Sequence, residues 1–211
     1  MTTQERRDHR IDIAAAVLLA IAAIATAWAT YQSSVWRGKQ AKAQSASIAT
    51  RVESTREASL ASRQVQIDVA LFIQWVNAFA RGEEELEAFY RGRFRDEFVP
   101  AFDAWVATKP RTNPDAPRSP FEMPQYKLAA TTKADELEAQ AAEFGLVVTR
   151  NIERADSYML AVVLFAVALF FAALSTRIGS RDVRIALVAL GYVLFVGTVL
   201  WLGTQPVSIS A

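Results

Sequence analysis

The chain has 211 residues, of which 52% are hydrophobic and 21% are charged, whereas soluble domains average roughly 45–50% apolar and about 25% charged residues. Three stretches carry no charge: residues 13–31, 157–176 and 185–211. A soluble domain spreads its charges over its surface, so this segregation excludes that class. The chain has no cysteine and one histidine, His9, which excludes disulfide frameworks, thiolate metal centres and multi-histidine sites. We therefore predict no metal site and no bound cofactor.

Three apolar segments are long enough to cross a membrane as helices, which takes about 20 residues. They cover residues 13–31, 158–176 and 185–203. Aromatic residues that favour the headgroup level stand near their ends: Trp28, Tyr31, Tyr158 and Trp201. The fold class predicted is all-α, an integral membrane protein with three transmembrane helices. The shorter segments are predicted as a polar tail (1–12), a basic loop (177–184) and a C-terminal tail (204–211).

The first apolar segment also has features of a secretory signal peptide. Arg6, Arg7 and Arg10 precede it, and Ala25-Thr26-Ala27 resembles a cleavage site. The segment is long for a signal sequence, and the helical pattern continues beyond it. We expect a retained anchor, with cleavage as the alternative.

Arginines near the spans indicate the orientation. The link between the second and third spans contains Arg177, Arg181 and Arg184 and lies on the same side as the N-terminal arginines. We expect this side to be cytoplasmic and residues 32–157 to lie outside. Arg37, Lys39 and Lys42 favour the opposite orientation.

The segment between the first two spans is predicted to form a helical domain, residues 32–157, as a hairpin or a three-to-four-helix bundle. Its residues 32–156 contain 17 Lys/Arg and 18 Asp/Glu, a balance that provides no basic field for nucleic acid. Residues 33–57 have a helix-forming composition, so the first span is expected to continue outward as a helix.

Residues 65–80 form the most apolar part of this domain. A stripe at 4,3,4,3 spacing contains Val65, Val69, Phe72, Val76 and Phe79. A second stripe of Ile67, Leu71 and Trp75 lies beside it, so the helix is apolar on two faces. We interpret it as a core or partner-facing helix. The alternatives are a membrane-surface or re-entrant segment and an oligomer interface.

The next segment is predicted to be helical from a start at Gly82-Glu83-Glu84-Glu85, where carboxylates suit a first turn. Within residues 86–108, a helical spacing of 4,4,3 favours one buried face, made of Phe94, Phe98, Phe102 and Trp105. Pro100 is expected to kink or divide this helix. Arg91, Arg93 and Arg95 are balanced by nearby carboxylates and are interpreted as a solvated face.

Residues 109–124 contain five of the seven prolines, which predicts an irregular loop that is either functional or mobile. Residues 127–143 return to a helical composition that leads towards the second span. Gly145 is the expected discontinuity in that helix.

No catalytic motif is present: glycine-rich phosphate loops and serine nucleophile elbows are both missing from the sequence. The spans contain no ionisable residue in their apolar interiors, and the polar groups inside the third span are Tyr192 and Thr198. The first span carries a face of small residues, which allows close helix packing. This face is a candidate for packing against the other spans or for oligomerisation: Ala16, Ala20, Ala23 and Ala27.

Residues 27–40 carry a Trp/Tyr pair at the end of a span, followed by W-x-G-x-Q at Trp36, Gly38 and Gln40. This segment resembles one found in uncharacterised bacterial three-span membrane proteins. The resemblance implies a bacterial cytoplasmic membrane and carries no activity to transfer. Physically, Trp28, Tyr31 and Trp36 are candidate interface anchors.

The sequence therefore favours a non-enzymatic protein of the bacterial cytoplasmic membrane that scaffolds or binds another protein, or another copy of itself. Membrane lipid is an expected partner, nucleic acid is not, and no small-molecule substrate is identified. The main alternative is a channel-forming oligomer or an auxiliary subunit of a transporter. A membrane-bound hydrolase is a further alternative.

Overall fold

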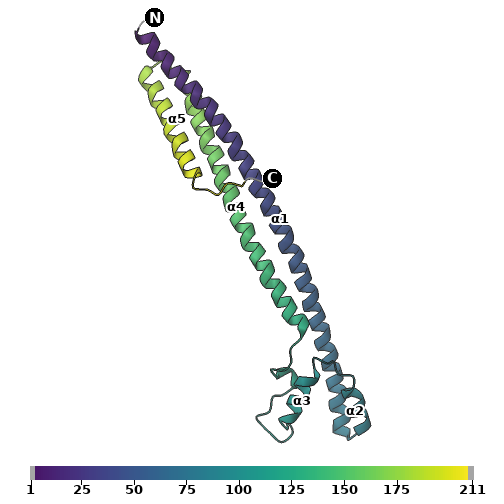
Figure 1. Ribbon diagram of the computed structural model, residues 1–211. Helices are drawn as coiled ribbons and strands as arrows, with labels where there is room; N and C mark the ends of the chain where they lie inside the picture. Colours follow the sequence, from purple (N-terminus) through teal and green to yellow (C-terminus); the bar gives the residue numbers. More distant parts are fainter. Residues whose placement is uncertain (1–2, 209–211) are drawn as a thin grey trace. The chain divides into compact units, whose positions relative to one another are not determined.

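The computed structural model describes residues 3–208, with side chains from residue 9 onward, and this part of the chain is all-α (Figure 1). It contains five α-helices and a short 3-10 helix: α1 (Thr3–Arg81), α2 (Glu84–Arg91), α3 (Val99–Ala107), η1 (Pro120–Glu122), α4 (Ala129–Ser175) and α5 (Arg181–Leu202). Helices α1, α4 and α5 each contain a segment long and apolar enough to span a membrane. The predicted fold class is thus confirmed, with short helices between the first two of these segments. The side chains of Arg6 and Arg7 lie outside the described ones.

Helix α1 is 79 residues long, as expected from a segment with no proline and one glycine. It ends where Gly82 adopts a positive φ of 69°. The backbone N–H of Glu83 then donates to the carbonyl of Ala78 at 3.1 Å, the bond that closes a helix around a left-handed residue. The predicted helix start after this glycine is confirmed by α2.

Two sequence expectations about helix breaks are wrong. Residues 86–108 do not form one helix divided at Pro100: α2 ends at Arg91, and Pro100 instead lies in the first turn of α3, where its missing N–H would have no partner anyway. Gly145 does not interrupt α4, which runs from Ala129 to Ser175. A single glycine inside a helix costs only about 1 kcal/mol relative to alanine, less than tertiary packing provides.

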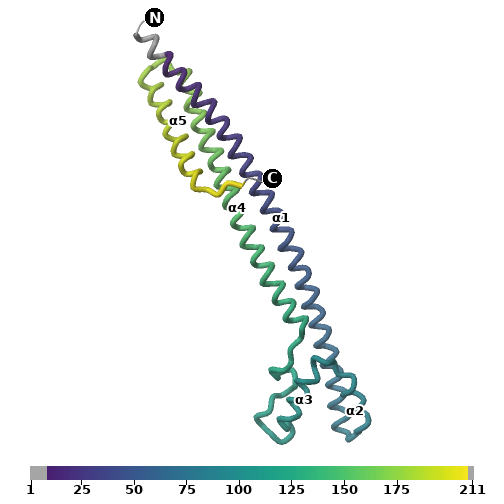
Figure 2. Tube along the Cα trace, in the orientation of Figure 1, coloured from purple at the N-terminus to yellow at the C-terminus, as the bar shows by residue number. Residues whose placement is uncertain are grey.

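The chain divides into two units. The first comprises residues 1–45 and 144–211, and the second residues 46–143. In the first unit, the N-terminal part of α1, the C-terminal part of α4 and α5 form a three-helix bundle (Figure 2). Its core contains Ala29, Trp36, Ala155, Tyr158, Ala161, Phe165 and Leu202.

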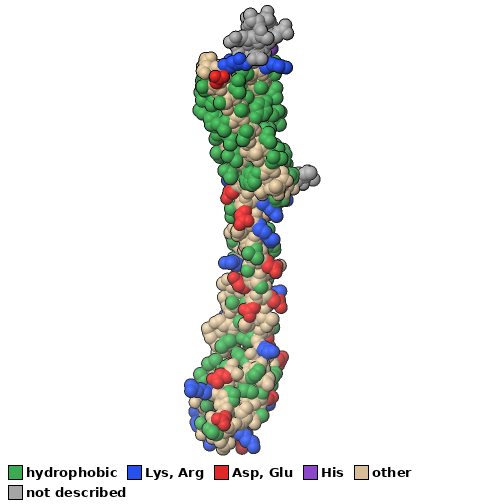
Figure 3. Space-filling view, turned by 90° about the vertical axis from the view of Figure 1, so that its left-hand side faces the viewer, with side chains coloured by type: hydrophobic (Ala, Val, Ile, Leu, Met, Phe, Trp, Pro, Cys, Tyr) green, Lys and Arg blue, Asp and Glu red, His purple; other side chains and the backbone are tan. Residues whose placement is uncertain are grey.

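Close packing in this bundle depends on small residues. A Cβ added to Gly191 of α5 would meet the Leu18 side chain of α1 at 2.9 Å and the carbonyl oxygen of Ala168 in α4 at 3.3 Å. Large apolar side chains point outward, including Ile24 (71% exposed) and Phe170 (60% exposed). Figure 3 shows hydrophobic side chains covering this unit between charged residues at its two ends. An outer surface of this kind suits hydrocarbon rather than water.

The second unit combines the C-terminal part of α1, helices α2 and α3, the proline-rich loop with η1, and the start of α4. Here α1 and α4 pair antiparallel through serine hydroxyls: Ser47 donates to the carbonyl of Ala141 and Ser54 to that of Ala134, each at 3.0 Å. The two bonds are seven residues apart on both helices, the period of a packed helix pair. Beyond this pairing lies an aromatic core whose buried members are Trp75, Phe94, Phe98, Phe102 and Trp105.

Candidate functional site

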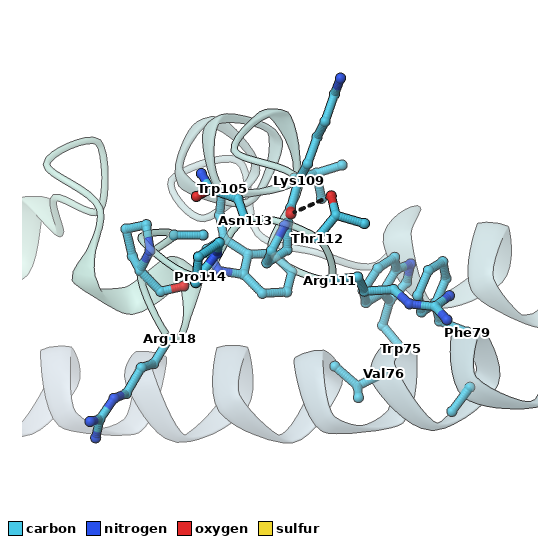
Figure 4. A pocket seen from close by; sticks show the side chains of 15 residues that line it. Trp75, Val76, Phe79, Trp105, Lys109, Arg111, Thr112, Asn113, Pro114 and Arg118 are labelled. Atoms are coloured by element: carbon cyan, nitrogen blue, oxygen red, sulfur yellow. Dashed lines mark hydrogen bonds between the residues drawn. The ribbon is translucent and has the colours of Figure 1, made fainter.

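A cavity of about 830 Å³ opens in the second unit between α1, the end of α3 and the loop after it. Its apolar surface comes from Trp75, Val76 and Phe79 of α1 and from Trp105 and Val106 of α3. The opposite side is formed by loop residues 109–114 and 116–118 (Figure 4). A concave, mostly apolar site with few polar groups is the usual form of a ligand-binding pocket.

The two α1 rings that line the pocket, Trp75 and Phe79, belong to a stack of three rings along one face of α1. Phe72, Trp75 and Phe79 follow a 3,4 spacing, so their rings lie one above another. Ring centroids are 6.3 Å apart for the first pair and 5.1 Å for the second, with interplanar angles of 12° and 14°. The Arg111 guanidinium extends the stack from the loop, 5.4 Å from the Phe79 ring centroid. A cation in that position is attracted by the ring face.

Hydrogen bonds fix the proline-rich loop that forms the other side. The indole N–H of Trp105 donates to the carbonyl of Pro117 at 2.8 Å. Asn113 donates through its side-chain amide to the carbonyl of Thr108 at 3.1 Å and accepts from the backbone N–H of Asp115 at 3.0 Å. Lys109 begins the loop with a positive φ of 54°, a conformation that reverses the chain at the end of α3. The irregular loop predicted for residues 109–124 thus forms one wall of the pocket.

The charged residues that line this pocket are all basic: Lys109, Arg111 and Arg118. Figure 4 shows the Lys109 and Arg118 side chains extending outward, with Arg111 lying beside Trp75 and Phe79. A second, smaller cavity of about 360 Å³ shares Trp75 and Val106 with the first. Its charged lining is mainly acidic and consists of Glu84, Glu87, Asp103 and Arg91. The two neighbouring cavities therefore have opposite charge.

Several charged and polar residues of the second unit form a buried hydrogen-bonded network around Asp68. Asp68 of α1 is fully buried, and its Oδ2 accepts hydrogen bonds from Arg95 Nη1 and from the Tyr126 hydroxyl, each at 3.0 Å. Arg95 also pairs with Glu97. Glu97 Oε1 accepts from the backbone N–H of Ala129 at 2.9 Å, at the first residue of α4, where a carboxylate is favoured. The network thereby ties α1, the turn before α3 and the start of α4 together.

Burial dominates the electrostatics of this network. Desolvation raises the pKa of Asp68 above its ordinary value of 3.8, while the hydrogen bond from Tyr126 and the positive charge of Arg95 partly oppose this shift. Burial, together with the carboxylate of Asp68, raises the pKa of Tyr126 above its usual range. Tyr126 therefore remains protonated and serves as a permanent donor to Asp68. The other oxygen of Asp68, Oδ1, is buried without a partner among the described residues.

Asp68 was missed by the sequence reasoning, although a signal was present. It is the one charged residue within the apolar segment 65–80, and a charge is rarely buried unless it is paired. Arg95, interpreted as part of a solvated face, is instead half-buried against it. Arg91 does lie at the surface, paired with Asp103 at 2.6 Å.

Part of the predicted apolar stripe of residues 65–80 packs inside the second unit, and the rest lines the pocket. Val65 packs against the small cluster formed by Ala61, Leu128 and Ala130. Phe72 joins the aromatic core, and Val69 is half-buried. Val76 and Phe79 remain 37% and 38% exposed and line the pocket.

The candidate alanine face of the first span is exposed at all four positions: Ala16, Ala20, Ala23 and Ala27. The face that packs within the chain is a neighbouring one, made of Ala15, Leu18, Ala22 and Ala29. Helix packing inside the bundle therefore does not use the four alanines. Their contact with another copy stays a prediction.

The three candidate interface anchors differ in environment. Trp28 and Tyr31 are 40% and 52% exposed, whereas Trp36 is 5% exposed. In the third span, the hydroxyl of Tyr192 donates to the carbonyl of Ala14, and that of Thr198 donates to Leu194 within its own helix. These hydroxyls thus serve packing between and within helices.

Comparisons with protein-family models, with curated proteins and with solved structures find no match to this chain. The resemblance based on residues 27–40 therefore stays an expectation. Among the described residues, no group of three or more His, Asp or Glu side chains could hold a metal ion.

Proposed function

We propose that this chain is a membrane-anchored binding module of the bacterial cytoplasmic membrane, whose second unit docks an acidic, apolar segment of a partner protein. The observation that carries the proposal is the aromatic pocket with exclusively basic charges in its lining. Aromatic side chains and arginine are the residues that most often anchor protein interfaces. Three spans of the first unit provide the anchor.

Charge complementarity identifies the kind of partner. Lys109, Arg111 and Arg118 carry three positive charges around apolar rings, with no carboxylate in the lining to neutralise them. A segment with one or two large apolar side chains flanked by Asp or Glu would fill the cavity and pair with these cations. Since the rim cations are exposed, they contribute mainly to the rate of association and to specificity, whereas the rings contribute most of the affinity.

The pocket is also prepared for binding before a partner arrives. The indole of Trp105 is fixed by its bond to Pro117, and the ring of Trp75 is held between those of Phe72 and Phe79. Pre-ordered side chains lose less conformational entropy on binding. We therefore expect affinity without a large rearrangement of this unit.

Site-specific photo-cross-linking in native membranes tests the proposal. A photoreactive residue at Val106, which is 43% exposed in the pocket, should give an adduct with a partner protein. The same residue at Leu60, which is 38% exposed outside the pocket, should not. Introducing Arg111→Glu should suppress the Val106 adduct, because it reverses the charge beside Phe79.

Three results would contradict the proposal. Equal labelling from Val106 and Leu60 would show that partner proteins do not contact the pocket in preference to the surface outside it. An adduct that is insensitive to Arg111→Glu would show that the positive charge of Arg111 does not contribute to binding. An adduct of twice the chain mass would identify a second copy as the occupant in place of a different protein.

A further inference from the structure

Two basic side chains lie over the ring of one tryptophan, Trp36, at the edge of the first unit. Trp36 of α1 is 5% exposed, and two basic side chains lie over its ring: Lys39 Nζ at 4.6 Å and Arg154 Cζ at 4.5 Å from the centroid. Neither cation makes an ion pair with another residue that the structure describes. The two distances place the charges no more than about 9 Å apart, which is close to the screening length of about 8 Å at physiological salt.

The depth of this cluster matches the headgroup layer of a bilayer. Trp36 lies five residues beyond Tyr31, where the apolar part of α1 ends, and Arg154 lies four residues before Tyr158, where the apolar part of α4 begins. At 1.5 Å per residue these steps correspond to about 7.5 Å and 6 Å. The headgroup region on each side of the hydrocarbon is roughly 5–8 Å thick. The cations therefore reach the level of the lipid phosphates.

Helix direction brings the two cations together at this level. Side chains tilt towards the N-terminus of their helix. Along α1 that direction leads from Lys39 back towards the apolar segment, and along α4 it leads from Arg154 away from it. The two side chains thus converge on Trp36 from opposite directions. Arg37, the residue after Trp36 in α1, adds a third exposed positive charge.

The two cations of the cluster have no anionic partner among the residues that the structure describes. The indole N–H of Trp36 is buried and has no hydrogen-bond acceptor among the described residues. Glu153 and Asp156 lie on the same stretch of α4, are exposed, and make no ion pair with a described residue. At the other edge of the unit, by contrast, Arg184 pairs with Asp12.

We propose that Trp36, Lys39 and Arg154, together with Arg37, form a binding site for the phosphate of an anionic phospholipid. The phosphate would lie between the two cations and relieve their repulsion, while the acyl chains would lie against the exposed apolar side chains of the bundle. A Lys or Arg side chain near an anionic lipid surface contributes about 1 kcal/mol of attraction. The site belongs to the first unit and is independent of the partner-binding pocket.

Native mass spectrometry of the full chain from mixed micelles of phosphatidylglycerol and phosphatidylcholine tests this site. The wild-type protein should retain phosphatidylglycerol in preference to phosphatidylcholine. The double variant Lys39→Gln/Arg154→Gln should lose about thirtyfold in phosphatidylglycerol affinity, the product of two similar single effects. Phosphatidylcholine retention should not change.

The matched control removes two exposed charges elsewhere on α1, at Arg56 and Arg63 of the second unit. The variant Arg56→Gln/Arg63→Gln should behave as wild type, and Lys39→Arg, which keeps the charge, should retain the lipid. An equal loss in the control, or no lipid preference in the wild type, would overturn the proposal.

Inorganic phosphate distinguishes a lipid site from a site for the free ion. Phosphatidylglycerol added to the protein in phosphatidylcholine nanodiscs should raise its unfolding temperature, and inorganic phosphate should not. A rise of equal size with inorganic phosphate would assign the site to the free ion and overturn the lipid proposal.

Discussion

Replacing Asp68 with alanine should destabilise the second unit without affecting the first. The substitution removes the acceptor of two hydrogen bonds, from Arg95 and from Tyr126. A hydrogen bond to a charged group contributes about 1.5–3 kcal/mol, but two features reduce the total. Arg95 keeps Glu97 as a partner and is 21% exposed, and the raised pKa of Asp68 shows that its buried charge is itself unfavourable. We expect a net loss of about 2–3 kcal/mol in unfolding free energy.

A double-mutant cycle measures the part due to Tyr126. Asp68→Ala, Tyr126→Phe and the double variant are unfolded by urea in detergent, in a background where Trp28, Trp36 and Trp201 of the first unit are replaced by Phe. The remaining emission, from Trp75 and Trp105, then reports on the second unit. The expected coupling energy between the two positions is about 1 kcal/mol. A loss below about 1 kcal/mol for Asp68→Ala, or no coupling to Tyr126, would refute the view that this network holds the unit together.

The same carboxyl group should make stability depend on pH. Because its folded pKa lies above 3.8, the native state holds the proton more tightly than the unfolded state does. The contribution of the protonated Asp68 carboxyl group to the unfolding free energy is therefore fully present below pH 3.8. It is lost as the pH rises through the raised folded pKa. The unfolding free energy of the wild type minus that of Asp68→Asn should fall as the pH rises through this window. A difference that stays flat or rises would contradict the assigned direction.

Further predictions concern packing and topology. Phe98→Ala should lower the unfolding free energy by about 3–5 kcal/mol, because Phe98 is fully buried and its ring stacks on Phe121 with centroids 5.2 Å apart. The same urea unfolding measures this loss, and a loss under about 1 kcal/mol would be inconsistent with that packing. Gly145→Ala should stabilise the chain by about 0.5–1 kcal/mol in thermal unfolding, because it lies inside α4 and an added Cβ meets nothing within 4 Å. Gly191→Val should lower the unfolding temperature, since the carbonyl oxygen of Ala168 lies 3.3 Å from the position of an added Cβ; an unchanged temperature would contradict the close packing of α5. In intact cells, a cysteine at Ser119 should react with an impermeant thiol reagent while one at Ser180 stays protected, and the reverse pattern would show that the orientation is inverted.

The spans and the all-α class follow from the sequence because hydrocarbon thickness fixes the length of an apolar helix. Local chemistry also places the end of α1 at Gly82, where a left-handed residue is needed. Pro100 and Gly145 show the limit of this approach. Both residues are helix breakers by propensity. Pro100 is nevertheless tolerated in the first turn of α3, where its missing N–H would have no partner, and tertiary packing keeps α4 continuous through Gly145.

The candidate site was harder to predict because its parts are distant in sequence. Trp75 and Trp105 belong to different helices, and Arg111 lies in a loop whose path is set by the bond from Trp105 to Pro117. Proline content predicted an irregular loop but not which rings it would cover. The charge of Asp68 was visible in the sequence, but its partners Arg95 and Tyr126 are 27 and 58 residues away.

The central claim, that the second unit binds acidic apolar segments through its basic aromatic pocket, is tested most directly by a charge swap. Two fluorescent peptides with the same tryptophan and leucine residues, one flanked by glutamates and one by lysines, are titrated against the full chain in phosphatidylcholine nanodiscs and followed by anisotropy. The account predicts that the glutamate peptide binds the wild type and loses affinity for Arg111→Glu, while the lysine peptide gains affinity for that variant. Equal binding of both peptides to both proteins, or binding of neither peptide to the wild type, would contradict it.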